Sequence, residues 1–430
     1  MNRYGLALGV AMSTLAVATA AGQSFTPGNL VLLQVGDGST AVTNAAQIVL
    51  LKEVTPTGGL VQTISMPATT AGVNRRLTQN GTATSEGFLT RSADKRYLFL
   101  VGYDAEPGST NPATQSSATV NRVIGSVAVD GSIDTTTAVT DASSSNIRAA
   151  ASTDGTHIWF AQAGTSTNAG VRHVTLGAPG NTSEPISATT GSATNVRCVD
   201  IFNGQLFVTG ATTAGPLLGV GSLGSTPPPT TGPEPIVQLS GFPTTSGPSA
   251  YQFFFADGQT LYVADDRTLT ATSGPGGIQK WTYDSISASW SLQYTLNSGL
   301  TTGLRSIAGR VDGGTVTIYA LTAGSASAGS ALVSITDSGA TSEFVTIMPA
   351  TANTWYKGIA FTPESTTPAC YANCDGSTTN PVLNVADFSC FLSKFAAGDA
   401  YANCDASTTT PVLNVADFSC FLSKFAAGCR

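Results

Sequence analysis

The sequence predicts an all-β domain followed by a small helical module. Between residues 25 and 362, short runs rich in Val, Ile, Tyr and Phe alternate with clusters of Gly, Pro, Ser and Thr. This alternation is typical of β-strands joined by tight turns. After residue 370 the pattern changes, because a 30-residue unit is written twice and each copy carries apolar residues at helical spacing.

One strand–turn–strand motif recurs along the first region. Each copy has an apolar strand, a turn with Asp or Asn, and a second strand rich in Tyr, Phe and Val. A sixth copy, which stops before its second strand, follows five complete ones, and the six occupy residues 87–104, 146–164, 195–210, 250–265, 303–323 and 355–365. The turns recur about every 50–60 residues, near the repeat length of four-stranded propeller blades.

The incomplete sixth copy indicates how the domain closes. Residues 29–35 (NLVLLQV) form a predicted strand with no first strand of their own, and they would supply the missing second strand. The two ends of the domain would then share one blade, which removes the open sheet edge. We therefore predict a six-bladed β-propeller over residues 25–364, with seven blades as the alternative.

The N-terminus is typical of a secretory signal peptide. Arg3 gives a positive start, residues 5–18 are apolar, and Ala18-Thr19-Ala20 is a small-x-small cleavage pattern. The apolar segment is too short for a stable membrane span, and no later run of about 18 apolar residues exists. We predict a signal peptide over residues 1–20, a secreted protein and no membrane span.

The composition narrows the range of partners. Charged residues make up only 10% of the chain, and the net charge is −7. We therefore expect no basic patch for nucleic acid and no polybasic membrane signal. Hydrophobic residues make up 41% of the chain, which is enough to build a buried core.

The C-terminal repeats are nearly identical. Tyr371–Gly398 and Tyr401–Gly428 differ at only two positions, Gly376/Ala406 and Asn380/Thr410. Each repeat is a loop of oxygen-bearing side chains that leads into the run VADFSCFLSKF. In the first copy this run places apolar side chains on one helical stripe, namely Val385, Phe388, Phe391, Leu392 and Phe395. One such helix cannot bury its stripe alone, so we expect the two helices to pack against each other.

The loops carry the kind of oxygen ligands that calcium prefers. In the two copies these are Asn373, Asp375, Ser377, Asn384 and Asp387, and Asn403, Asp405, Ser407, Asn414 and Asp417. Calcium takes six to eight oxygens, and in such loops the last carboxylate leads into a helix, as Asp387 and Asp417 do. We predict two calcium ions of weak, extracellular-type affinity, because each loop holds only two carboxylates. A helical pair stapled by disulfides without metal is the alternative.

Residues 370–429 resemble a dockerin, the duplicated calcium-loop module that bacteria append to secreted proteins so that a cohesin domain captures them. The resemblance is closest to the variant with one Cys in the loop, Asn373-Cys374-Asp375-Gly376, and another after the Asp-Phe pair, Asp387-Phe388-Ser389-Cys390. Two features depart from the pattern: the loop has fifteen residues instead of twelve, and its first ligand is Asn. The resemblance implies a bacterial protein, a cohesin-like partner and a module over residues 370–430. Residues 365–369 (STTPA) are the predicted linker into this module.

Cysteine usage indicates an oxidising compartment. Six of the seven cysteines lie in the repeats, a module too small to depend on a hydrophobic core alone. Repeat symmetry favours the pairs Cys374–Cys390 and Cys404–Cys420 with a terminal bridge Cys370–Cys429. The exchanged pairs Cys374–Cys420 and Cys404–Cys390 are the alternative. Cys198 is left unpaired, and we expect it to be buried.

The first strands of the blades share a polar position. It holds Arg148, Arg197, Arg305 and Lys357 in four blades, and Gln252 in a fifth. Equivalent positions on innermost strands surround the channel of a propeller, so the four cations would form a positive funnel. Because guanidinium groups bind carboxylate, sulfate or phosphate, we predict an anion site on the axis. In the alternative, each cation pairs with a nearby acid such as Asp200 or Glu86, or bonds to carbonyls.

The sequence offers no catalytic constellation that we can identify. His157 and His173 have no Cys, Glu or His nearby at metal-ligand spacing. We therefore interpret the chain as a non-catalytic extracellular binding protein that is assembled or retained at a surface through its C-terminal calcium-dependent module. Its propeller would take an anionic or carbohydrate ligand. The alternative is a carbohydrate-active enzyme, a hydrolase or lyase with the propeller as its catalytic domain, because dockerins are often attached to polysaccharide-degrading enzymes.

Overall fold

The computed structural model describes residues 23–164, 167–188, 193–210, 216–272, 274–365, 370–377, 381–405 and 407–428. The predicted signal peptide, most of the predicted linker and Cys429 lie outside these residues. The chain divides into two compact units, one of Met1–Ala93 with Tyr97–Pro363 and one of Glu364–Arg430 with the short segment Asp94–Arg96. None of the helices in the described part of the chain has the length and apolar character needed to span a bilayer.

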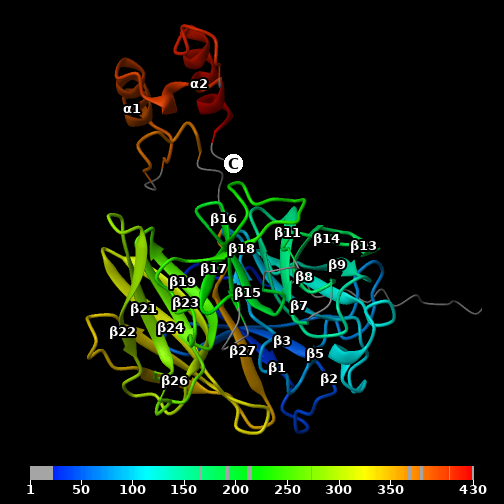
Figure 1. The fold of residues 1–430 in the computed structure, drawn as a ribbon. Coiled ribbons are helices and arrows are strands. Elements are labelled where there is room, and N and C mark those ends of the chain that lie inside the picture. The colour runs from blue at the N-terminus through cyan, green and yellow to red at the C-terminus, as the bar shows by residue number, and fades with distance from the viewer. Residues whose placement is uncertain are drawn as a thin grey trace, which may run out of the picture. The chain divides into compact units, whose positions relative to one another are not determined.

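The first unit is a six-bladed β-propeller (Figure 1). Blade 1 has the strands β6 (Thr90–Arg91), β7 (Tyr97–Tyr103), β8 (Arg122–Ala128) and β9 (Ile133–Val139), with β13 (Pro179–Asn181) added at its outer edge. Blade 2 has β10 (Ile147–Ser152), β11 (His157–Gln162), β12 (Gly170–Thr175) and β14 (Glu184–Pro185). Blade 3 has β15 (Val196–Phe202), β16 (Gln205–Gly210), β17 (Val220–Leu223) and β18 (Ile236–Gln238).

The remaining blades follow the same order. Blade 4 has β19 (Ala250–Asp257), β20 (Thr260–Asp265), β21 (Gly277–Asp284) and β22 (Ser289–Leu296). Blade 5 has β23 (Leu304–Asp312), β24 (Thr315–Thr322), β25 (Ala331–Thr336) and β26 (Val345–Pro349). Blade 6 has β27 (Trp355–Phe361), β1 (Leu30–Val35), β3 (Val49–Val54) and β4 (Leu60–Ser65). The short strands β2 (Ala46–Gln47) and β5 (Gln79–Asn80) pair with each other, and the 3-10 turn η1 (Pro112–Thr114) precedes β8.

Blade 6 closes the ring as the sequence predicts. Strand β1 pairs antiparallel with β27, from Leu30 opposite Phe361 to Val35 opposite Trp355, and every residue of β1 is buried. The first strands contact one another around the full ring, β6 with β10, β10 with β15, β15 with β19, β19 with β23, β23 with β27 and β27 with β6. Six blades are therefore confirmed and seven are excluded.

The core of the propeller lies between neighbouring blades. Its largest apolar cluster runs from Phe88 through blades 2 to 5 and includes Trp159, Trp281 and Trp290. Alternating residues of the strands enter this core from both faces of each sheet, which is why the strands are apolar over most of their length. Cys198 is buried in the same cluster and forms no disulfide, as predicted.

The second unit contains the two predicted helices, α1 (Val385–Ala396) and α2 (Val415–Ala427), with a short 3-10 turn η2 (Ala400–Ala402) between them. Phe391 and Phe421 are fully buried, and their rings stack with centroids 4.2 Å apart. The expected packing of the helices is confirmed. The expected stripe was too wide, because Val385 is 80% exposed and Leu392 is 46% exposed. Val385 lies at the first helical position and Leu392 lies about 100° around the helix from Phe391, away from the partner helix.

The repeats are closed by the disulfides Cys374–Cys390 and Cys404–Cys420, with Cα atoms 5.7 Å and 5.8 Å apart. Each bridge ties a loop to the helix of its own repeat, so the exchanged pairing is excluded. The third predicted bridge depends on Cys429, which lies outside the described residues.

Candidate functional site

The first repeat loop is organised by the Asp387 carboxylate, which is buried. Its Oδ2 accepts a hydrogen bond from the Asn384 backbone N–H at 2.8 Å, and its Oδ1 accepts one from the Asp375 N–H at 3.3 Å. The Asn384 side-chain oxygen in turn accepts from the Ala386 N–H at 2.7 Å. This is a capping box, so two of the predicted calcium ligands also hold the start of α1.

The second loop repeats this geometry. Asp417 is buried and accepts from the Asn414 N–H at 2.8 Å, while the Asn414 side chain accepts from the Ala416 N–H at the same distance. The Asn414 N–H lowers the pKa of the Asp417 carboxyl. Each loop therefore presents a carboxylate held by backbone donors next to the helix N-terminus, where the helix dipole favours negative charge.

The two loops differ at their first predicted ligand. Asn403 Oδ1 accepts a hydrogen bond from the Ser407 N–H at 3.0 Å, whereas Asn373 Oδ1 is buried with no hydrogen-bond partner. Among the described residues, no three His, Cys, Asp or Glu side chains lie close enough to hold a metal. An unpaired buried amide oxygen beside carboxylates fits a hard, weakly held cation in the first loop better than a strongly chelated one.

The predicted axial residues lie on the first strands, and their polar atoms bond to neighbouring blades. Arg148 donates to the Val196 carbonyl at 3.0 Å, across the junction of blades 2 and 3. Arg197 donates to the Ala250 carbonyl at 3.0 Å, across the junction of blades 3 and 4, and its guanidinium lies 3.9 Å from the Tyr251 ring centre. These two arginines therefore join successive blades around the axis.

The other predicted axial residues behave similarly. Arg305 pairs with Asp266 at 3.0 Å, and Lys357 pairs with Glu86 at 3.3 Å. Gln252 donates to the Leu89 carbonyl at 2.9 Å, which places a hydrogen bond between blade 4 and the segment that opens blade 1 on the opposite side of the ring. A cavity of only about 10 Å³ borders Arg305 and Lys357, which is room for a single water molecule.

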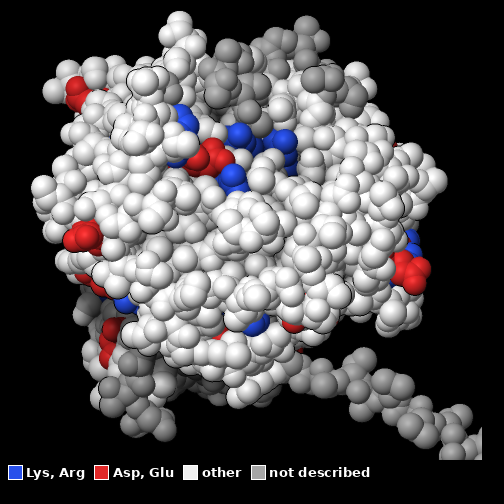
Figure 2. Space-filling model, turned by 90° about the horizontal axis from the view of Figure 1, so that it is seen from below, with Lys and Arg blue, Asp and Glu red and all other residues white. Residues whose placement is uncertain are grey.

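Arg148 and Arg197 differ from the other axial cations. In the described part of the chain, neither forms an ion pair, and the Nε atom of each is buried without a hydrogen-bond partner. Burial lowers the pKa of Arg148 to about 10, and the neighbouring charge of Arg197 acts in the same direction. Figure 2 shows one group of basic side chains around an acidic one above the centre of this face, and other charged residues scattered over a mainly uncharged surface.

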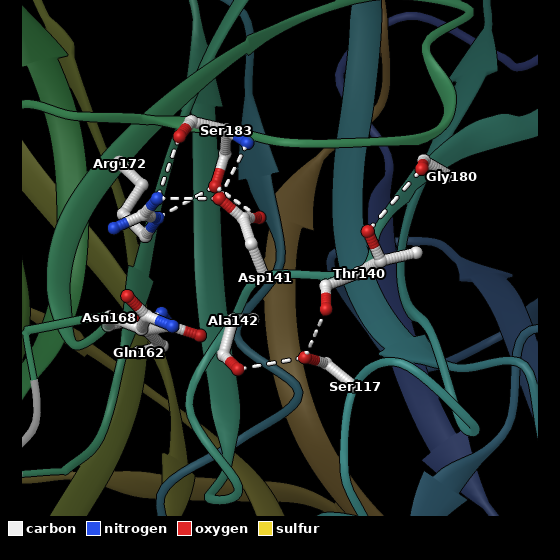
Figure 3. A network of polar contacts seen from close by, with 9 residues as sticks. All are labelled: Ser117, Thr140, Asp141, Ala142, Gln162, Asn168, Arg172, Gly180 and Ser183. Atoms are coloured by element: carbon white, nitrogen blue, oxygen red, sulfur yellow. Dashed lines mark hydrogen bonds and ion pairs between the residues drawn. The ribbon is translucent and has the colours of Figure 1, made fainter.

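A polar pocket that the sequence did not indicate lies where blades 1 and 2 meet. Its volume is about 650 Å³. The described residues that line it are Ser116, Ser117, Thr140, Asp141, Ala142, Ser143, Ser144, Ser145, Gly164 and Asn168. Figure 3 shows the carboxylate of Asp141 directed toward Arg172 and Ser183, on the opposite side from Ser117. The serine-rich run ASSSN at 142–146 is visible in the sequence, but the other residues that line the pocket come from loops distant in sequence.

A histidine pair is a second feature that sequence spacing could not show. Antiparallel pairing of β11 and β12 sets Trp159 opposite His173, and this register brings His157 Nδ1 within 3.0 Å of His173 Nε2. Burial, and then the proximity of His157, lower the pKa of His173 to about 4. His173 is therefore uncharged at neutral pH and shares a hydrogen bond with His157.

No protein-family profile matches this chain, and no curated protein matches it. Several solved structures match it at low similarity. A chain of the nidogen/laminin complex is 11% identical, with 78% of this chain and 98% of that chain covered and a TM-score of 0.44. A protein of unknown function from Bacteroides caccae is 11% identical, with 79% of this chain and 100% of that chain covered and a TM-score of 0.44. The WD40 β-propeller domain of Doa1 is 9% identical, with 75% of this chain and 87% of that chain covered and a TM-score of 0.39. Similarity at this level carries no argument about function.

Proposed function

We propose that this chain is a secreted extracellular binding protein, in which the propeller carries the ligand site and the C-terminal repeats dock the protein to a cohesin-like partner. One observation carries the docking role. Val385 and Val415 are 80% and 79% exposed, and Leu392 and Leu422 are 46% and 41% exposed, at equivalent positions of α1 and α2. Apolar side chains that the module's own core leaves uncovered, twice over, support a protein-binding surface on each helix.

The near identity of the repeats extends the proposal to two binding orientations. A half-turn of the module would exchange the α1 surface for the α2 surface, so one partner site could engage either. The test uses the full-length chain and a purified cohesin domain in a pull-down and by calorimetry. Changing Val385 and Leu392 to Glu should be nearly silent, and adding Val415→Glu and Leu422→Glu should abolish capture. Loss of capture from the first pair of changes alone would contradict two orientations.

We further propose that the loops take calcium. The residues in place are Asn373, Asp375, Ser377 and Asp387 in the first loop, with their counterparts in the second. Asp387 also caps α1, so replacing it cannot separate the metal from the helix. The matched variants Asn373→Ala and Asn403→Ala can separate the two effects. Of these two side-chain oxygens, that of Asn373 lacks a hydrogen-bond partner and that of Asn403 has one. Calcium titration by calorimetry should show a larger loss of affinity for Asn373→Ala, and equal heats for both variants and the parent would contradict the proposal.

Arg148 and Arg197 support an anion as the propeller ligand, because they carry charge without a carboxylate partner in the described residues. An anion that binds only the folded state raises the melting temperature by mass action. Sulfate or citrate should therefore stabilise the propeller, the gain should fade in sodium chloride, and Arg197→Ala should reduce it. Arg305→Ala is the control, since Arg305 already pairs with Asp266 at 3.0 Å.

The non-catalytic role has its own test, in which polysaccharides are incubated with the full-length chain. Release of reducing ends from them would contradict this role.

A further inference from the structure

Hydrogen bonds hold together two of the loops that line the polar pocket between blades 1 and 2. One loop joins η1 to β8, and the other joins β9 to β10. Ser117 from the first loop donates its hydroxyl to the carbonyls of Thr140 and Ala142 in the second, both at 2.8 Å. Figure 3 shows this bridge at one side of the pocket. The spacing of the two walls is therefore set by direct bonds between them.

A buried arginine also forms hydrogen bonds to both of these walls. Arg122, the first residue of β8, is fully buried and donates to the carbonyls of Ala113 and Gln115 in one loop and of Ser143 and Ser145 in the other, at 2.8–3.1 Å. Burial lowers its pKa, and no ion pair involves it in the described residues. Burying a guanidinium without a carboxylate is costly unless its donors are satisfied. Here backbone carbonyls of both pocket walls accept from its Nη2 and the Val120 carbonyl accepts from its Nη1, while its Nε has no partner, so the guanidinium ties the two walls together.

The charges at the pocket cancel. Asp141 is the one charged residue among the described lining residues, and its carboxylate pairs with Arg172 at 2.7 Å. Ser183 donates to the same carboxylate through its N–H at 2.9 Å and its hydroxyl at 3.0 Å. The Asp141 side chain is nevertheless 20% exposed, so it can accept a further hydrogen bond. The described lining therefore holds no unpaired cation that would favour a phosphate, sulfate or uronate group over a neutral ligand.

The remaining lining groups are hydroxyls and amides. Ser116, Ser144 and Asn168 are exposed at the pocket, and Thr140 and Ser145 are partly exposed. Gln162 donates its side-chain amide to the Asn168 carbonyl, which holds Asn168 at the rim. Hydroxyls donate and accept at once, and an amide does both with separate atoms. The described lining is thus complementary to a ligand with many hydroxyl groups.

We propose that this pocket binds a neutral carbohydrate, whose hydroxyls form hydrogen bonds with the serine-rich walls and donate to the Asp141 carboxylate. The volume of about 650 Å³ lies within the 300–1,000 Å³ typical of small-ligand sites and admits more than one sugar ring. The proposal gives a ligand class to the binding role of the propeller and is independent of the docking repeats. It also differs from the anion proposed at Arg148 and Arg197, which is a separate place and a separate chemistry.

The test measures binding of oligosaccharides to the full-length chain by calorimetry and ligand-observed NMR. The probes are neutral β-1,4-linked hexasaccharides of glucose, xylose and mannose, with an oligogalacturonate of similar length as the acidic counterpart. At least one neutral probe should bind and the acidic one should not. Binding of the acidic probe alone, or of no probe at millimolar concentration, overturns the proposal.

Variants locate the site. Ser144→Trp should fill the pocket and abolish binding, whereas Ser327→Trp, at an exposed serine of blade 5, should leave it unchanged. Asn168→Ala should weaken binding about tenfold, as expected for the loss of one strong or two weak hydrogen bonds. The Glu variants of α1 and α2 should bind the sugar like the parent chain, so failure of docking and failure of this site are distinguishable. Sugar binding that survives Ser144→Trp would place the site elsewhere and refute the assignment.

Discussion

The propeller and the repeat module solve the same stability problem in different ways. The propeller closes a ring in which each first strand contacts the next, and its apolar clusters hold dozens of buried side chains. The module has a small cluster around Phe391 and Phe421. Accordingly, the free cysteine Cys198 is buried in the propeller, while both described repeats of the module are closed by disulfides. A unit too small to bury enough apolar surface depends on disulfide bonds for its stability.

The two units also reverse the usual placement of side chains. The propeller buries charged groups, such as Arg122 and the pair Lys357–Glu86, and these groups bond to carbonyls or to each other. The module exposes apolar groups, such as Val385 and Val415. The buried charges connect blades and loops, so they serve structure. The exposed apolar groups serve no contact within the module, which is why we assign them to docking.

The strongest test of this comparison is removal of the two described disulfides. Each closes a loop of 16 residues in sequence separation, and such a loop contributes roughly 3 kcal/mol in the chain-entropy model. Replacing Cys374, Cys390, Cys404 and Cys420 by Ser should therefore destabilise the module by about 6 kcal/mol and unfold it. The helical circular dichroism signal should be lost while the β-signal and the melting temperature of the propeller stay unchanged.

The control for that experiment is Cys198→Ala, which should leave the helical signal intact. Retention of the full helical signal after all four replacements would mean that the module does not depend on these two bridges, against the comparison.

The second test removes an aromatic side chain from the module core. Phe391 is fully buried against Phe421, with ring centroids 4.2 Å apart, so Phe391→Ala should cost about 3–5 kcal/mol. Its neighbour Leu392 is 46% exposed, and Leu392→Ala should cost less than about 0.5 kcal/mol. Urea denaturation followed at the helical signal measures both. Similar losses for the two variants would show that Leu392 is part of the core and that the exposed patch is not available for docking.

The sequence predicted the fold because the features that set it are local and repeated. The six motifs, the orphan strand at 29–35 and the duplicated helical run each show a periodic pattern, and all three are confirmed. The polar pocket and the histidine pair were missed because each joins residues from different loops or strands. Ser117, Arg122 and Ser143 look unrelated in sequence, and only the order of blades brings them together. The axial position was found from motif alignment, but the bonds between blades depend on partners that no alignment of first strands reveals.

The third test concerns the buried histidine of blade 2. His173 is 7% exposed with a pKa of about 4, against about 6.5 in the unfolded chain. Between these values the unfolded chain binds more protons, so this residue makes stability fall as pH is lowered from about 6.5 to about 4. Its contribution should amount to about 2 kcal/mol between pH 7 and pH 5. Denaturation of the propeller at both pH values measures it.

The comparison must be made between the parent chain and His173→Gln. Burial raises the pKa of Asp200 to about 7, and this carboxyl makes stability rise as pH falls through the same range. The two effects oppose each other in the parent chain, and only the difference between variant and parent isolates His173. An identical pH dependence in both proteins would contradict the assignment.

The smallest expected effect is at the N-termini of the two helices, where capping hydrogen bonds add to the stability that the small core provides. Asn384 accepts from the Ala386 N–H at 2.7 Å and Asn414 from the Ala416 N–H at 2.8 Å, so each Asn→Ala change should cost about 1 kcal/mol in excess chelator. Asn384→Ser keeps a capping oxygen and should recover most of that loss, while the exposed neighbour change Val385→Ala should be close to neutral. Repeating the denaturation in excess calcium sharpens the result. If the Asn384 oxygen also binds the ion, as the sequence predicts, the loss for Asn384→Ala must grow when calcium is added. An equal loss with and without calcium would leave Asn384 as a cap and place any calcium on the remaining oxygens of the loop.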